Sequence, residues 1–190
     1  FLDGLAHVDA ARLPEARACF EQSLRWLPGR PSTLTNLAAT HIRLGQPAAA
    51  LPLLQQVIAA EPGNAEAWCQ QGVALGDLER RDEALQSLQR AINLAPEHTP
   101  GHALSRYHRG ITLNVLRRHE AALADFAWLV QQQPDRAEAW FRHGQTLQAL
   151  GRHAEALPAY ERALALDDTL AQAWSNLGGI HKLAGRLDAA

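Results

Sequence analysis

The chain has 190 residues, with 20 acidic and 18 basic side chains and a formal net charge of −2 at pH 7. Because the two signs are interspersed, the sequence lacks the clustered basic face that nucleic-acid binding requires, and no nucleic-acid partner is expected. No apolar run approaches the roughly 18 residues that would suggest a membrane-spanning helix, and no signal peptide is visible, so no membrane association is expected.

One pattern of 34 residues organises the chain and is clearest from Ala65 to His98. This stretch has Trp68 at its fourth place, Gly72 at its eighth, Ala84 at its twentieth and Pro96 at its thirty-second. A single unit of this size cannot bury its own apolar face, so the pattern should recur in step along the chain.

In chain order, the pattern divides the sequence into repeats, of which the first and last are incomplete: 1–30, 31–64, 65–98, 103–136, 137–170 and 171–190. The incomplete ends and the absence of Met predict that the chain is a fragment of a longer protein. The frame slips once, by the four residues Thr99 to His102. Thr99 and Pro100 are typical of a helix start, so this insertion should add about one turn to the next helix.

Each repeat is expected to form two helices joined by a turn. The eighth and twentieth places hold only Gly or Ala, which allows close approach of the helices, while the fourth and twenty-fourth places are mostly large and apolar. Helix ends are also indicated. Asn64 is suited to cap the helix that follows it, and four prolines should lie just past second helices: Pro28, Pro62, Pro96 and Pro134.

This spacing resembles the tetratricopeptide repeat family, whose unit is a helix–turn–helix of 34 residues. The resemblance implies an all-α fold, in which about six repeats form a right-handed superhelical solenoid and a single domain over residues 1–190. It also implies a concave groove lined by the first helix of each repeat. In this family the second, fifth, sixth, ninth, twelfth and thirteenth places face that groove.

The sixth places are all polar and form a predicted ladder of hydrogen-bond donors: Asn36, Gln70, His108, Arg142 and Asn176. The ladder is similar to the asparagine ladder in the repeats of O-linked N-acetylglucosamine transferases, which holds the backbone of an extended peptide. Only Asn36 and Asn176 carry the amide found there. The alternative is that a solvent-facing place is simply polar.

The fifth and ninth places predict an apolar floor beside the ladder, formed by Cys69, Val73, Tyr107, Ile111 and Phe141. Aromatic anchors next to backbone-binding amides suit recognition of a peptide or a partner helix. The alternative for Tyr107 is that it belongs partly to the core, because the fourth place of its repeat holds Arg106 in place of a bulky apolar residue.

Trp128 stands at the twenty-sixth place, where the other repeats have polar residues: Gln22, Gln56, Arg90 and Arg162. Those equivalents predict a place that faces solvent on the convex side. Trp128 therefore either packs over a neighbouring repeat or forms a second contact site. Self-association through the open ends of the solenoid is a further expectation.

No catalytic or metal site is predicted. The nine histidines fall largely at repeated places of the pattern, which favours packing, and no phosphate loop, nucleophile elbow or paired carboxylates occur. We therefore expect no enzyme activity, no metal and no cofactor. Cys19 and Cys69 lie in different repeats and should be too far apart for a disulfide, which favours a reducing, cytoplasmic compartment.

The sequence thus predicts a protein–protein interaction module that binds an extended peptide or a partner helix in its groove. Two alternatives stay open. The repeats could be the substrate-presenting arm of a larger transferase whose catalytic domain lies beyond Ala190, or they could be a structural assembly scaffold.

Overall fold

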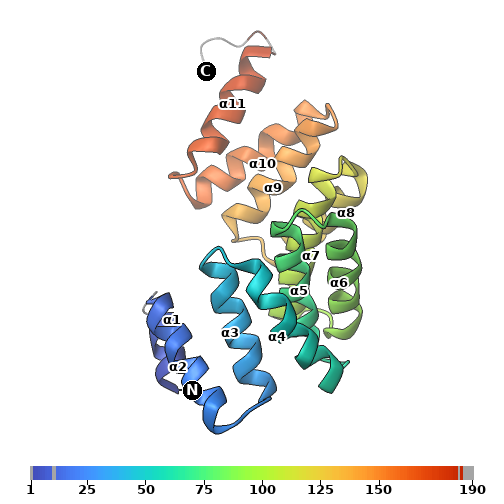
Figure 1. Cartoon of the computed structure of the whole chain (residues 1–190). Helices are drawn as coiled ribbons and strands as arrows, with labels where there is room; N and C mark the ends of the chain where they lie inside the picture. The colour runs from blue at the N-terminus through green and yellow to red at the C-terminus, as the bar shows by residue number, and fades with distance from the viewer. Residues whose placement is uncertain (1, 10–11, 184, 186–190) are drawn as a thin grey trace. The chain divides into compact units, whose positions relative to one another are not determined.

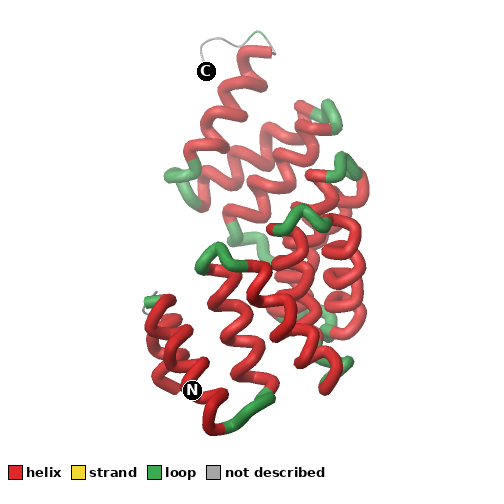
Figure 2. Tube along the Cα trace, viewed as in Figure 1, coloured by secondary structure: helices red, strands yellow, loops and turns green. Residues whose placement is uncertain are grey.

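The computed structural model describes residues 2–9, 12–183 and 185, and within them every regular element is an α-helix (Figures 1 and 2). The helices are α1 (Leu2–Asp9), α2 (Leu13–Trp26), α3 (Pro31–Arg43), α4 (Pro47–Ala60), α5 (Ala65–Asp77), α6 (Arg81–Leu94), α7 (Pro100–Val115), α8 (His119–Gln132), α9 (Ala137–Ala149), α10 (His153–Leu166) and α11 (Ala171–Leu183). The prediction of an all-α fold is confirmed.

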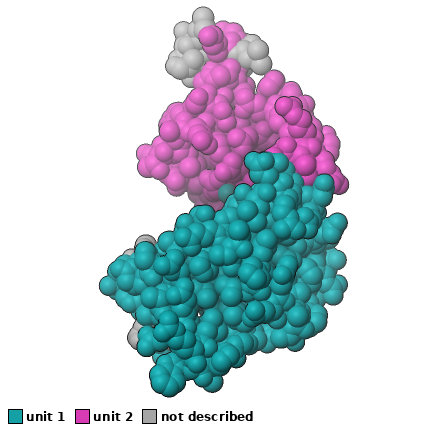
Figure 3. All heavy atoms as spheres, viewed as in Figure 1, with its two compact units in different colours: residues 1–108 teal, residues 109–190 magenta. Residues whose placement is uncertain are grey.

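The chain forms two compact units, residues 1–108 and 109–190 (Figure 3). The boundary falls inside α7. In the first unit α1 packs on α2, α3 on α4 and α5 on α6, as the helix–turn–helix pattern predicts. In the second unit α9 packs on α10 in the same way. Helix α8 contacts α9, and α11 contacts α10.

The two helices of a hairpin approach closely where the side chain at the twenty-fourth place, on the second helix, packs against the residue at the eighth place, on the first helix. The facing pairs are Gly4 and Phe20, Gly72 and Leu88, Gly110 and Phe126, and Gly144 and Tyr160. A methyl group added to Gly72 would lie 2.5 Å from Cγ of Leu88, far inside van der Waals contact. The eighth place is therefore small because it receives a large side chain.

The predicted helix ends are also confirmed. The second helices α2, α4, α6 and α8 each end two residues before a proline of the repeat pattern. Asn64 caps α5, because its Oδ1 accepts a hydrogen bond of 3.0 Å from the backbone N–H of Ala67.

The tryptophans at the fourth place add a link that sequence reasoning missed. The indole Nε1 of Trp68 donates to the carbonyl oxygen of Pro62 at 3.0 Å, and that of Trp140 to Pro134 at 2.9 Å. Trp174 donates to the carbonyl oxygen of Asp168 at 2.9 Å. The acceptor in each case is the backbone carbonyl of the thirty-second residue. The hydrogen bond therefore forms whether that residue is Pro, as in Pro62 and Pro134, or Asp168.

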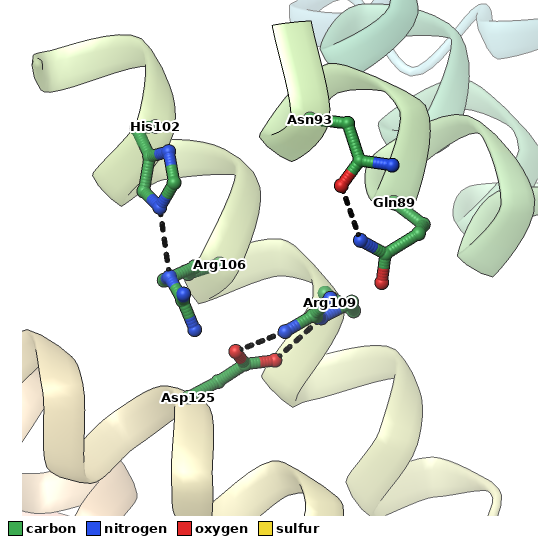
Figure 4. Close-up of polar contacts among 6 residues, drawn as sticks. All are labelled: Gln89, Asn93, His102, Arg106, Arg109 and Asp125. Atoms are coloured by element: carbon green, nitrogen blue, oxygen red, sulfur yellow. Dashed lines mark hydrogen bonds and ion pairs between the residues drawn. The ribbon is translucent and has the colours of Figure 1, made fainter. Parts of the chain in front are cut away.

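The seventh and twenty-third places form a second contact between the helices of a hairpin. In the third repeat Ser87 Oγ donates to Gln71 Oε1 at 3.0 Å. In the fourth repeat Arg109 holds the fully buried Asp125 through both nitrogens of one edge of its guanidinium, with Nε 2.7 Å from Oδ2 (Figure 4). The same two places can therefore carry a neutral polar pair or an ion pair.

The four-residue insertion forms a helical turn, as predicted. Helix α7 begins at Pro100 and has 16 residues, whereas α3, α5, α9 and α11 have 13. Thr99 caps it, since its Oγ1 accepts a 3.3 Å hydrogen bond from the backbone N–H of His102. The buried His102 is held in turn by Arg106, whose Nε donates to His102 Nε2 at 2.9 Å (Figure 4).

The close approach at the eighth place can be tested with Gly72→Ala. We expect this change to lower the free energy of unfolding by about 1–3 kcal/mol, because Leu88 must shift or the helices must separate. Gly101→Ala is the matched control, since an added Cβ there meets no atom within 4 Å. Urea unfolding followed by circular dichroism measures both. Equal midpoints for the two variants would contradict the packing argument.

The buried ion pair makes a second prediction. Asp125→Leu should cost about 3 kcal/mol, because it leaves the Arg109 guanidinium without its buried carboxylate. Adding Arg109→Leu should recover most of that loss, since the second repeat has Leu37 and Leu53 at the same two places. The double-mutant cycle, measured by urea unfolding, would reject this account if the two losses simply added.

Candidate binding site

An apolar pocket of about 480 Å³ lies in the first unit, between the start of α5 and the start of α7. We call it the insertion pocket. Its lining residues are Ala65, Glu66, Cys69, Gln70, Ala95, Pro96, Thr99, Pro100, Gly101 and Leu104. It brings together Cys69 and Gln70, which the sequence placed side by side on the expected groove face.

The pocket depends on the four-residue insertion. Three of the inserted residues, Thr99, Pro100 and Gly101, line it, and Leu104 extends this wall one turn further along α7. Leu104 keeps 36% of its surface exposed, and this exposed apolar surface is continuous with the apolar lining of the pocket. The sequence predicted the extra turn but not the pocket, because a pocket requires the spacing between two helices.

Cys69 is a buried group of this pocket, with 3% of its surface exposed. Burial raises the pKa of the Cys69 thiol, a hydrogen bond with Ser105 lowers it to a smaller extent, and the carboxylate of Glu66 raises it further. The thiol therefore stays neutral at physiological pH, which suits an apolar packing group and not a nucleophile.

The rest of the predicted groove in the first unit is half-buried. Asn36 Nδ2 donates to the carbonyl oxygen of Ser32 at 2.8 Å, one turn back on its own helix. Tyr107 and His108 form an edge-to-face contact, with ring centroids 5.4 Å apart and an interplanar angle of 82°. Val73 is half-buried, so its side chain is partly accessible.

In the second unit the structure corrects the predicted apolar floor. Phe141 is only 2% exposed and belongs to the core cluster around Tyr160, with ring centroids 6.0 Å apart. A ring that packs against the second helix of its own hairpin cannot also be an exposed anchor. Cys69 is buried in the same way, so only Val73, Tyr107 and Ile111 of the predicted floor are partly accessible.

Arg142 is held by its own helix. Its Nε donates to Glu138 Oε1 at 2.9 Å and its Nη1 donates to Gln145 Oε1 at 3.1 Å. The guanidinium carbon also lies 5.4 Å from the centroid of the Phe141 ring. These contacts fix the side chain over the core of the fifth repeat.

Asn176 links two helices of the second unit. Its Nδ2 donates to the Tyr160 hydroxyl at 3.1 Å, and that hydroxyl donates to Gln148 Oε1 at 2.7 Å. Burial raises the pKa of Tyr160 to about 12, although the hydrogen bond from Asn176 acts in the opposite direction. One of the two ladder residues with the expected amide therefore has a structural contact that the sequence did not indicate.

Two further pockets, of about 330 Å³ and 630 Å³, lie beside the hairpins of the third and fifth repeats at equivalent places of the pattern. In the larger one, Nδ1 of His143 is buried and has no hydrogen-bond partner among the described residues. Burial lowers the pKa of His143, and Arg152 lowers it further, while Glu155 opposes both effects. His143 thus favours its neutral form.

These two pockets show where the equivalents of Trp128 lie in other repeats. Arg90 and Arg162, its equivalents in the third and fifth repeats, line them. The twenty-sixth place therefore borders the cleft beside a hairpin in those two repeats. Trp128 itself is half-buried, which agrees with the first of its two alternatives, packing against its neighbours. A contact role for Trp128 stays a prediction. The most exposed tryptophans described are Trp26, at 80%, and Trp174, at 55%.

Over the described ranges, no three His, Cys, Asp or Glu side chains gather in an arrangement that could hold a metal ion. In the same residues, every helix is too short or too polar to cross a lipid bilayer. Cys19 and Cys69 both carry free thiols, as expected from their separation in the sequence.

The two thiols should react at different rates. Cys19 is half-buried, whereas Cys69 is buried, and burial raises the pKa of the Cys69 thiol and so lowers its thiolate fraction. With Ellman's reagent at pH 8 we expect Cys69 to react about ten-fold or more slowly, and to accelerate as the pH rises toward 9. Cys19→Ser and Cys69→Ser variants isolate each thiol. Equal rates would contradict the burial of Cys69.

Comparison with known proteins agrees with this architecture. Two models of the family described as tetratricopeptide repeat match the sequence, one at residues 7–71 and 42–106 and the other at 107–171 and 141–190. No curated protein matches the chain.

Solved structures are similar in fold at low sequence identity. The structure of pilF from Pseudomonas aeruginosa has a TM-score of 0.85 and 18% identity, over 98% of this chain and 83% of that one. YrrB has a TM-score of 0.72 and 20% identity, over 90% and 86%. MamA from Desulfovibrio magneticus RS-1 has a TM-score of 0.75 and 22% identity, over 83% and 87%. Because the family models together match residues 7–190, the chain belongs to the tetratricopeptide repeat family.

Proposed function

We propose that this chain is a protein-interaction module that binds an extended peptide segment on the faces of its first helices. The observation that carries the proposal is the insertion pocket, which combines an apolar wall with Gln70, a member of the predicted polar ladder. An apolar recess beside a hydrogen-bonding amide suits recognition of a peptide, because the recess takes a side chain and the amide takes the backbone.

The comparisons support the same general role. YrrB, which has the same fold, is described as a tetratricopeptide repeat protein with an unusual peptide-binding site. Peptide binding by the present chain is our inference from the pocket and the family. Its free cysteines are consistent with the cytoplasmic location that we propose.

Within the predicted ladder, we propose that Asn36, Gln70 and His108 contact the backbone of the bound segment. We propose that they do so in the way the asparagine ladder of O-linked N-acetylglucosamine transferases holds the backbone of an extended peptide. Arg142 and Asn176 hydrogen-bond other side chains of the second unit, which leaves them less free to contact a partner. Asn36 has one amide N–H bonded to the Ser32 carbonyl of its own helix, so its other N–H and its Oδ1 are the groups proposed to contact the bound segment. A transferase arm or an assembly scaffold would use the same helix faces, so the experiment below bears on them as well.

The experiment selects ligands from a random 12-residue peptide library displayed on phage, with the whole chain as bait. Fluorescence anisotropy then gives Kd for the enriched peptides. Asn36→Ala combined with Gln70→Ala should raise Kd about ten-fold, because two amide hydrogen bonds contribute roughly 1–3 kcal/mol in total. The melting temperature should change little, since both side chains are only half-buried and belong to no described core cluster, and the hydrogen bond of Asn36 stays within its own helix.

The matched control is Gln22→Ala combined with Gln56→Ala, which removes two exposed amides from second helices and should leave Kd unchanged. An equal loss of affinity in the two double variants would reject the ladder. A library that yields no peptide binding to the folded chain would reject the proposed function itself.

A further inference from the structure

We propose that the insertion pocket sets the sequence specificity of this module, by accepting one bulky apolar side chain of a partner segment that carries Lys or Arg at an adjacent position. This inference rests on the proposed function and names the chemistry of its partner. Two departures from the repeat pattern meet at this pocket: the inserted turn and Leu104, at the second place of the fourth repeat.

The first argument is the lining of the pocket. The second place is polar in the other repeats, with Ser32, Glu66, Glu138 and Gln172, but it is Leu104 in the fourth. Leu104 faces the same pocket as the inserted residues. An exposed leucine at a normally polar place, beside a pocket of about 480 Å³, provides an apolar surface large enough for a Leu, Phe or Trp side chain.

The second argument is charge. Glu66 is the one charged residue among those that line the pocket, and it is exposed in the first turn of α5. Among the described residues its carboxylate has no ion pair or hydrogen bond. Its equivalent in the fifth repeat, Glu138, is paired with Arg142 at the sixth place. In the third repeat the sixth place is Gln70, so Glu66 lacks that internal cation. An unpaired carboxylate at an apolar pocket favours a basic group on the partner.

The interior of the pocket is consistent with this assignment. The buried Cys69 thiol stays neutral because burial raises its pKa, so no charge opposes entry of an apolar side chain. Gln70 lies beside the pocket and is available to hydrogen-bond the backbone of the segment that supplies this side chain.

The experiment uses the same random 12-residue library and the whole chain. We expect the enriched peptides to share a Leu, Ile, Phe, Met or Trp adjacent to Lys or Arg. Gly101→Leu fills the pocket, and because an added Cβ at Gly101 meets no atom within 4 Å, the fold should tolerate it. This variant should raise Kd of an enriched peptide at least about ten-fold.

Two controls separate filling of the pocket from other effects. Gly101→Ala adds only a methyl group and should keep Kd within about two-fold. Gly63→Leu places the same side chain on an open loop position, where an added Cβ also meets nothing within 4 Å, and should leave Kd unchanged. Circular dichroism confirms that each variant keeps its helices.

The charge argument has its own test. Replacing the basic residue of the enriched peptide by Ala should raise Kd roughly two- to five-fold, as expected of an accessible ion pair. In Glu66→Gln this difference should disappear, and it should shrink at high salt in the wild-type chain. A difference that persists in Glu66→Gln would overturn the assignment of Glu66.

The outcomes distinguish the two proposals. Peptides that bind and respond to Asn36→Ala with Gln70→Ala, but not to Gly101→Leu, would overturn the pocket while the proposed function stands. Absence of any peptide that binds would overturn both. If light scattering shows that the chain self-associates and Gly101→Leu abolishes this, the occupant is a second copy and the assignment to a partner segment is wrong.

Discussion

The structure depends on the contact between the eighth and twenty-fourth places of each repeat. A large side chain of the second helix, such as Phe20, Leu88 or Phe126, packs directly against a residue that has no side chain. In these hairpins an added carbon at the eighth place would force the helices apart or displace the large residue. The second repeat accommodates one methyl group here, since Ala38 packs with Leu54 in the same core cluster. Because the two places are always 16 residues apart, the same kind of contact recurs along the chain. The polar pairs at the seventh and twenty-third places meet directly beside it, because each of their residues precedes one of the contacting pair.

A repeated frame also makes departures informative. Some variation stays within one physical requirement. The seventh and twenty-third places hold a hydrogen-bonded pair in the third repeat and an ion pair in the fourth, and in both the two side chains satisfy each other's polar groups. The inserted turn and Leu104 are different, because they add exposed apolar surface that no packing contact within the hairpin requires. Apolar surface of this kind has a free-energy cost in water, which burial by a partner would remove. A binding site is therefore best sought where a departure from the pattern exposes apolar surface that no contact within the protein buries.

The residues of the predicted ladder differ in whether their polar groups already bond other side chains of the protein. Asn176 and Arg142 have the residue types expected of a peptide-binding surface, but their hydrogen bonds go to Tyr160, Glu138 and Gln145. Such contacts stabilise neighbouring helices and reduce what is left for a ligand. Gln70 differs because it borders an apolar pocket. A ladder that looks uniform in sequence is thus non-uniform in chemistry, and its first unit is the better place to look for a partner.

The sequence by itself determined the family, the all-α fold, the helix boundaries near the prolines and the extra turn before Ala103, because these follow from local propensity and from a strict 34-residue period. Only the tertiary structure decided which residues on the predicted groove face are accessible. Phe141 and Cys69 share places with Tyr107 in the pattern, yet they are buried, since exposure depends on the side chains that neighbouring helices supply. The insertion pocket likewise could not be predicted from the sequence. It exists because an added turn of α7 stands beside the start of α5, and the separation of two helices far apart in the chain is a property of packing, not of either segment alone.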